Sequence, residues 1–227
     1  MSRNSFINFY SGYQIFYSKN SPGYTDFSLF LSGNVFASTT FNSDASYASI
    51  VVPDYSLGLA KKLLNLNKFE KLLTVTIRNS RYDKLRNSPF PEWAKFVHYA
   101  IKLGYRVVVL PDTENSLEFD PISPHLVYNE FIYNVELRAA LYQISQCNLG
   151  VANWPMTLST LNPLAKSTLM FKIAPKGSEL ASEFINSNIN PDDPRFYYNS
   201  CTVNLTLDDT FENIKNVFNE VFRKNVL

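Results

Sequence analysis

The sequence predicts an α/β fold, in which a parallel sheet is covered by helices on both faces. Short apolar runs of strand length alternate with amphipathic patterns of helix length from about residue 70 to about residue 225. A polar residue follows an apolar run at Arg78, Asp112 and Asn153. The carboxyl ends of parallel strands lie at one edge of their sheet, where ligands bind. We therefore expect these three residues to lie together at that edge.

The first part of the chain, residues 1–69, is expected to be a small, strand-rich extension that forms only a partial domain. Alternating apolar residues on either side of Ser21-Pro22-Gly23 predict a hairpin or two strands. The expected elements are strands at 13–17, 27–31 and 49–52, and a helix at 54–65.

Residues 70–227 are expected to form the main domain. Apolar runs predict its strands, and apolar residues at helical spacing between Pro, Gly and capping residues predict its helices. The expected strands are 71–77, 105–110, 148–153, 168–173 and 196–205. The expected helices are 89–103, 133–147, 155–161 and 178–186, with a long loop at 113–130. A last helix follows Asp209-Thr210-Phe211-Glu212, a segment typical of a capping box.

Composition limits the class of protein. The chain has 227 residues, of which 45% are hydrophobic and 18% are charged, as expected of a globular protein. A net charge of +1 argues against binding of nucleic acid or an anionic membrane, because both need a basic face. The start, MSRNSFINFY, has no apolar signal region, and no apolar run is long enough for a transmembrane segment. We expect a cytoplasmic protein, and with two His and two Cys we expect no metal site.

The loop after the first main strand is a candidate phosphate site. Arg78 leaves the strand directly, and Arg81 and Arg86 follow in the same loop. Guanidinium groups bind a diphosphate through bidentate, charge-assisted hydrogen bonds. The alternative is an ordinary solvated loop. Asn87 and Ser88 end the loop, and we expect one of them to cap the next helix, a role compatible with ligand contact.

The other two strand ends offer further ligand contacts. Asp112 is placed to accept from a ribose hydroxyl or a base N–H, although Pro-Asp is also common in turns. Asn153, Met156 and Thr157 surround a strand–helix junction. The first N–H groups of such a helix bind phosphate in many α/β proteins, and here the Thr157 hydroxyl is placed to add a contact. The alternative for these residues is an ordinary helix start.

A charged pair lies on the helix before that junction. Glu136 and Arg138 are two residues apart and so face different sides of the helix. Because a buried charge needs a partner, we expect Arg138 to be structural and paired with Glu136, Asp112 or Glu114. No residue is assigned a catalytic role: neither histidine is a convincing base, and no nucleophile elbow, glycine-rich dinucleotide motif or Walker loop is present.

Several short motifs occur in a recognisable order. They are Thr76-Ile77-Arg78, Arg86-Asn87-Ser88, Trp93, Pro111-Asp112-Thr113-Glu114, Leu137-Arg138-Ala139-Ala140-Leu141-Tyr142 and Asn148-Leu149-Gly150-Val151. Over about residues 70–222 the chain resembles bacterial proteins from surface-polysaccharide contexts. These look like the nucleotide-sugar-binding, C-terminal half of GT-B glycosyltransferases, especially the fucosyltransferase-like and heptosyltransferase-like branches. The resemblance implies a Rossmann-like domain over 70–227, in which Arg78 contacts the diphosphate, Asp112 the base and Thr157 a phosphate.

The resemblance also implies a function. The substrate would be a nucleotide-diphosphate sugar, and no cofactor would be needed. The sugar would be transferred without a metal to an acceptor glycan of unknown identity, during surface polysaccharide synthesis. A degenerate, non-catalytic interaction or sugar-binding module is the alternative, because Trp154 stands where related proteins usually have glycine before proline and residues 1–69 are too few for a first Rossmann-like domain. An epimerase or hydrolase on this architecture is a third reading. Homo-oligomerisation is left open.

Overall fold

A computed structural model describes residues 6–8, 14–16, 50–67, 70–81, 83–111, 128–172, 175–178, 181–182, 202–204 and 207–223. Its centre is a five-stranded sheet in the order β4-β3-β5-β6-β7, with every neighbouring pair parallel. The strands are β3 (Lys71–Thr76), β4 (Tyr105–Leu110), β5 (Cys147–Val151), β6 (Thr168–Phe171) and β7 (Thr202–Asn204). The predicted α/β fold is confirmed, and the four strands expected between 71 and 173 share one sheet.

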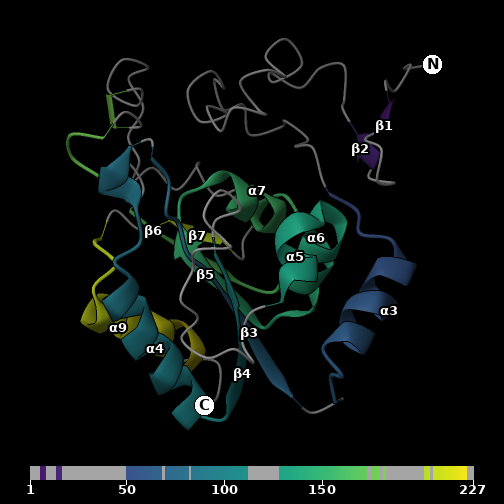
Figure 1. Cartoon of the computed structure of the whole chain (residues 1–227), viewed down its shortest axis with the longest axis horizontal. Helices are drawn as coiled ribbons and strands as arrows, with labels where there is room; N and C mark the ends of the chain where they lie inside the picture. The colour runs from purple at the N-terminus through teal and green to yellow at the C-terminus, as the bar shows by residue number, and fades with distance from the viewer. Residues whose placement is uncertain are drawn as a thin grey trace.

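Helices lie on both faces of this sheet (Figure 1). One face carries α4 (Phe90–Lys102) and α9 (Phe211–Arg223), and the other carries α3 (Asp54–Leu63), α5 (Asn129–Tyr133), α6 (Val135–Ile144) and α7 (Trp154–Thr160). Strand β4 shows why both faces are covered: Val107 and Val109 are buried on the α4 side, whereas Val108 and Leu110 are buried on the α6 side. A strand that is apolar on both faces needs a helix layer on each of them.

The strand order reverses at β3. The chain leaves β3 through α4 to β4 on one side and returns through α6 to β5 on the other side. Ligands of open α/β sheets bind in the crevice at the carboxyl ends of the strands beside such a reversal. The expected ligand crevice therefore lies at the carboxyl ends of β3 and β5.

The N-terminal region is described only in part. β1 (Phe6–Asn8) pairs antiparallel with β2 (Gln14–Phe16), so the strand expected at 13–17 is present but is paired with an earlier segment. The segment expected at 27–31 lies outside the described residues. Ile50 forms only an isolated bridge, where a short strand was expected, and its N–H donates to the carbonyl of Leu161 at 2.9 Å. Helix α3, expected in the extension, packs against α6 and shares its hydrophobic core.

Some predicted boundaries are wrong. The helix expected at 133–147 is shorter: α6 covers Val135–Ile144, because the Asn134 side chain accepts from the N–H groups of Glu136 and Leu137 and begins the helix there, and Cys147 already belongs to β5. The preceding helix, α5, starts inside the expected loop 113–130. Of the helix expected at 178–186 and the strand expected at 196–205, only 181–182 and 202–204 are described as regular structure.

The expected capping box before α9 is also corrected. The Thr210 hydroxyl accepts from the N–H of Asn213 at 3.3 Å and caps the helix. Glu212 pairs with Lys215 instead of reaching back, and Asp209 is used elsewhere in the structure.

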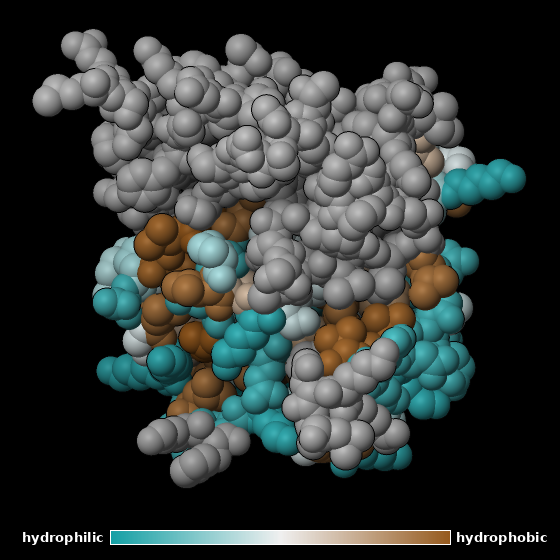
Figure 2. Space-filling model, turned by 180° about the vertical axis from the view of Figure 1, so that it is seen from behind, coloured by the Kyte–Doolittle hydropathy of each residue, from teal (hydrophilic) through white to brown (hydrophobic). Residues whose placement is uncertain are grey.

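The surface is mixed. Hydrophobic and hydrophilic side chains alternate over the described part of the face opposite to that of Figure 1 (Figure 2). In the described ranges, no helix has the length and apolar character that crossing a bilayer requires.

Candidate ligand-binding site

The two loops at the strand reversal lie side by side. Thr76 of β3 is in register with Gly150 of β5, so Arg78 and Asn153 follow neighbouring strands at the same edge. The backbone continues the sheet past both strands: the N–H of Ile77 donates to Leu110 at 2.9 Å and that of Ala152 to Phe171 at 3.1 Å. The third expected member of this group, Asp112, lies outside the described residues.

Hydrogen bonds join the start of the β3–α4 loop to its end. The N–H of Arg78 donates to the Ser88 hydroxyl at 3.0 Å, and the N–H of Ser88 donates to the Arg78 carbonyl at 2.9 Å. The Asn87 amide accepts from the N–H of Ser80 at 3.0 Å and donates to the Ser80 carbonyl at 2.9 Å. These contacts fix the backbone from which the Arg78 side chain extends.

The expected capping role of Asn87 and Ser88 is therefore wrong. Helix α4 begins after Pro89 with no side-chain cap. The side chains of Asn87 and Ser88 form hydrogen bonds with backbone groups of the loop. These groups compete with the first N–H groups of the helix for short polar side chains. This explains why residues with strong capping preference fail to cap here.

Arg86 connects the two loops. Its Nη2 donates to the carbonyl of Ala152, at the end of β5, and its Nη1 lies 3.9 Å from Oδ2 of Asp83. The backbone of Asp83 is left-handed, with φ of 46°, just before a short 3-10 turn at Lys84–Arg86. Arg86 thus ties the β3–α4 loop to the β5–α7 turn, while Arg81 is exposed to solvent.

The start of α7 is capped by the protein itself. Oδ1 of Asn153 accepts from the N–H of Met156 at 3.1 Å. The Met156 side chain is fully buried in the core, and Thr157 is half-buried. Trp154 begins the helix, and its side chain lies outside the described residues.

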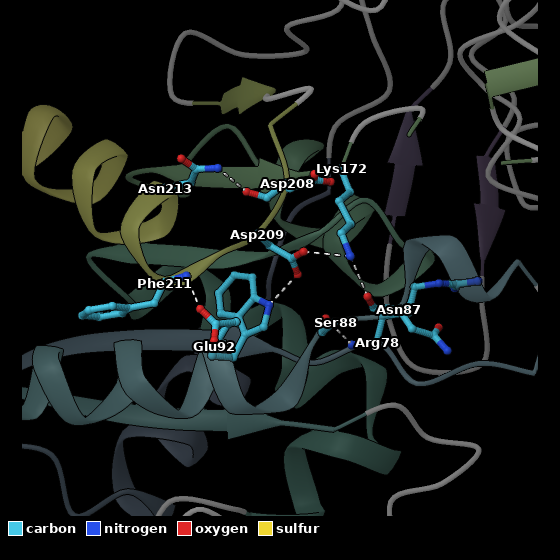
Figure 3. A network of polar contacts seen from close by, with 10 residues as sticks. Arg78, Asn87, Ser88, Glu92, Lys172, Asp208, Asp209, Phe211 and Asn213 are labelled. Atoms are coloured by element: carbon cyan, nitrogen blue, oxygen red, sulfur yellow. Dashed lines mark hydrogen bonds and ion pairs between the residues drawn. The ribbon is translucent and has the colours of Figure 1, made fainter. Parts of the chain in front are cut away.

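A buried network that the sequence analysis missed supports the other side of the loop (Figure 3). The ammonium of Lys172, directly after β6, lies 2.8 Å from Oδ1 of Asp209 and donates to the Asn87 carbonyl at 2.9 Å. The Trp93 indole N–H donates to Oδ2 of Asp209 at 2.6 Å. The signal for this network was Trp93 itself, because an indole on the apolar face of a helix needs a buried acceptor for its N–H.

Glu92 extends this network to the last helix. Its carboxylate accepts from the N–H of Phe211 at 2.8 Å, in the first turn of α9 (Figure 3). Hydrogen bonds from Lys95 and from the Phe211 N–H lower the pKa of Glu92, so the carboxylate is charged where it meets the positive end of the α9 dipole. Helices α4 and α9 are thereby joined beside the candidate site.

On the α6 side, polar groups are buried beneath the helices. The Thr74 hydroxyl donates to the Asn148 amide oxygen at 2.6 Å, and the amide nitrogen of Asn148 donates to the Ser159 hydroxyl at 2.8 Å. Nearer the carboxyl edge, the Thr76 hydroxyl is 2.9 Å from the Tyr142 hydroxyl. Burial raises the pKa of Tyr142, and the nearby Arg138 charge opposes that rise.

Glu136 and Arg138 are both buried, but among the described contacts they do not pair with each other. Glu136 accepts from the Ser56 hydroxyl of α3. Arg138 instead faces the sheet, with Nη2 3.5 Å from the carbonyl of Pro111, just after β4. The expected Arg138–Glu136 pair is therefore wrong. The other two expected partners, Asp112 and Glu114, lie outside the described residues.

The charges at this edge are suited to binding an anion. Arginine and lysine side chains gather around the ends of β3, β5 and β6. Within the described ranges, no group of three or more His, Cys, Asp or Glu side chains is arranged to hold a metal ion.

No family model and no curated protein matches the sequence, but solved structures do match its fold. E. coli ADP-heptose LPS heptosyltransferase II aligns with a TM-score of 0.57 and 9% identity, over 82% of this chain and 57% of that one. A family 9 glycosyltransferase from Veillonella parvula DSM 2008 aligns with a TM-score of 0.52 and 14% identity, over 78% of this chain and 48% of that one. The chain spans about half the length of both structures. The resemblance noted from the motifs is thus confirmed at the level of the fold, which is GT-B-like and similar to that of the heptosyltransferases.

Proposed function

We propose that the protein is glycosyltransferase-like and binds a nucleotide-diphosphate sugar at the carboxyl ends of β3 and β5. The observation that carries this proposal is the position of Arg78. It follows β3 directly at the strand reversal, and the Ser88 side chain and backbone hold its own backbone on both sides. A guanidinium that extends from a backbone fixed at this place is suited to bidentate contact with a diphosphate.

The proposed chemistry is transfer of the sugar without a metal. The leaving diphosphate would gain negative charge as the bond to the sugar breaks, and preorganised positive charge stabilises that change. Arg78 would supply the charge, with Thr157 contacting a phosphate and Asp112 contacting the nucleoside. An acceptor glycan of surface polysaccharide synthesis, and a cytoplasmic location, belong to the same proposal.

A second candidate is a non-catalytic sugar-binding or interaction module. It is favoured by the polar groups that the protein already uses at this edge. Arg86 is bound to the Ala152 carbonyl, Lys172 is paired with Asp209, and the Asn153 side chain caps α7. Cations that already bind groups of the protein are less available to bind a ligand.

Binding and turnover distinguish the two candidates. The full chain is titrated with nucleoside diphosphates by calorimetry, and each ligand that binds is then supplied as its nucleotide sugar to measure release of the diphosphate. Binding with release supports the transferase, and binding without release supports the module. Trp154→Gly is the discriminating variant: a gain of nucleotide affinity indicates that Trp154 obstructs a decayed site. If no nucleoside diphosphate binds either the natural protein or this variant, the transferase proposal is eliminated.

A further inference from the structure

Arg138 is a buried cation with very little compensation. Only 4% of the residue is exposed. Its one side-chain hydrogen bond in the described part of the chain is the long contact from Nη2 to the Pro111 carbonyl, at 3.5 Å, and its buried Nε has no partner. Burying a guanidinium without a charged partner is costly, because the lost hydration is not replaced.

The neighbouring acid does not relieve this cost. Glu136, two residues earlier on α6, accepts from Ser56 on the side of the helix that faces α3. The described ion pairs of the chain include none with Arg138. The other buried polar groups on this face, such as Asn148 and Ser159, bond to one another. Within the described residues, the Arg138 charge is therefore left largely without compensation.

The position of Arg138 suggests a role for this charge. Helix α6 leads into β5, so its first turns lie near the carboxyl edge of the parallel sheet. Tyr142, one turn further along, reaches the Thr76 hydroxyl at the end of β3, and Arg138 reaches Pro111 just after β4. The guanidinium thus lies just after β4, and its charge is near enough to Tyr142, which contacts the end of β3, to affect the pKa of that hydroxyl.

We propose that Arg138 is a second anion-binding residue, which contacts the diphosphate from the α6 side of the sheet while Arg78 contacts it from the β3–α4 loop. This inference rests on the proposed function, because it assigns a partner for the same diphosphate. The proposal explains why a cation is buried at the carboxyl edge of the sheet: the negative charge of the bound phosphate would compensate the positive charge of Arg138. The Tyr142–Thr76 hydrogen bond then has a positioning role, since it fixes α6 against β3.

The test compares Arg138→Met with the natural chain by thermal unfolding, without ligand and with inorganic pyrophosphate or nucleoside diphosphates. We expect the ligand-free Tm of the variant to be equal or higher, because an uncompensated buried charge is removed. We also expect the Tm increase caused by pyrophosphate to disappear. A lower ligand-free Tm would mean that Arg138 also stabilises the fold, and binding of pyrophosphate to Arg138→Lys then decides the proposal. An unchanged response to pyrophosphate would overturn it.

Arg138→Lys covers the case in which the Met variant does not fold. The ammonium keeps the charge but cannot make the planar bidentate contact, so we expect about tenfold weaker pyrophosphate binding or more. Unchanged affinity in the Lys variant would contradict the inference. Arg106→Met is the control, because Arg106 pairs with Glu70 at 3.2 Å at the opposite, amino-terminal end of β4. It should leave the response to pyrophosphate unchanged.

The two proposals fail separately. If pyrophosphate binding depends on Arg138 but no nucleoside diphosphate binds, the anion site stands and the nucleotide-sugar function falls. If nucleoside diphosphates bind the natural chain and Arg138→Met equally well, the function stands and the role of Arg138 is overturned. If the natural chain responds to neither ligand, both are overturned.

Discussion

The Trp93 indole N–H donates to the Asp209 carboxylate at 2.6 Å, across 116 residues of sequence. The other oxygen of that carboxylate lies 2.8 Å from the Lys172 ammonium, which also holds the Asn87 carbonyl. One buried carboxylate therefore links α4, the end of β6, the start of α9 and the loop that carries Arg78. The site loop is supported by this network as much as by its own hydrogen bonds.

Removing the Lys172 cation should leave the buried Asp209 carboxylate without its charged partner, although the Trp93 indole hydrogen bond remains. Asp209 is 1% exposed, so we expect Lys172→Met to lower the free energy of unfolding by about 3–5 kcal/mol in urea denaturation. Lys215→Met is the control: it breaks a more exposed pair with Glu212 on α9 and should cost less than about 1 kcal/mol. The double variant Lys172→Met, Asp209→Asn should recover part of the loss. Equal effects of Lys172→Met and Lys215→Met would show that the buried pair contributes no more than a surface one.

The fold was predictable because its pattern is local. Strands such as β4 are apolar on both faces, and helices such as α4 bury a stripe of residues at helical spacing. Both patterns can be read from a few neighbouring residues. The order of the strands and the position of the reversal were not predicted, because they depend on pairings between segments that are distant in sequence.

The polar contacts were less predictable because their partners are distant in sequence. Ser88 and Asp209 stand just before helices and were expected to cap them. In the structure Ser88 bonds to Arg78, and Asp209 bonds to Trp93 and Lys172. The capping preference of a residue type can be read from the local sequence, but the distant group that competes for its side chain cannot. The start of α6 could have been found, because Asn134 followed by Val-Glu-Leu is typical of a helix start.

Gly150 is needed for close packing between β5, β3 and α7. A Cβ at this position would lie 2.9 Å from the Thr76 carbonyl oxygen and 3.2 Å from Sδ of Met156. Because the carbonyl belongs to the neighbouring strand and cannot move freely, we expect Gly150→Ala to destabilise the protein by about 1–3 kcal/mol. Thermal or urea unfolding measures this.

Gly58→Ala is the matched control for that substitution. Gly58 lies in α3, and a Cβ there would meet no atom within 4 Å. Alanine should stabilise the helix by roughly 0.4–1 kcal/mol, because glycine loses more backbone freedom on folding. If Gly150→Ala were as harmless as Gly58→Ala, the close approach of β5 to β3 would not constrain the fold.

The buried thiol of Cys147 should make stability depend on alkaline pH. Burial raises the pKa of Cys147 from 9.0 to about 12. Above about pH 9 the unfolded thiol loses its proton while the folded thiol keeps it, so the unfolded state is favoured increasingly up to about pH 12. We expect the natural chain to lose more stability than Cys147→Ala between about pH 8 and about pH 10.5, measured by urea denaturation. Parallel pH profiles for the two proteins would contradict the assignment.

Arg78 provides the direct test of the ligand site. The two contacts with Ser88 use the Arg78 backbone, so they are kept when the Arg78 side chain is shortened. We expect Arg78→Ala to weaken binding of a nucleoside diphosphate by about 1.5–3 kcal/mol, roughly ten- to a hundredfold, in calorimetry. Arg78→Lys should recover only part of this loss, since an ammonium lacks the planar fork. Arg81→Ala is the control, because Arg81 is exposed in the same loop and its removal changes the net charge equally. A similar loss of affinity in both Ala variants would mean that the loop attracts anions only through its overall charge, and Arg78 would then have no specific role in holding the diphosphate.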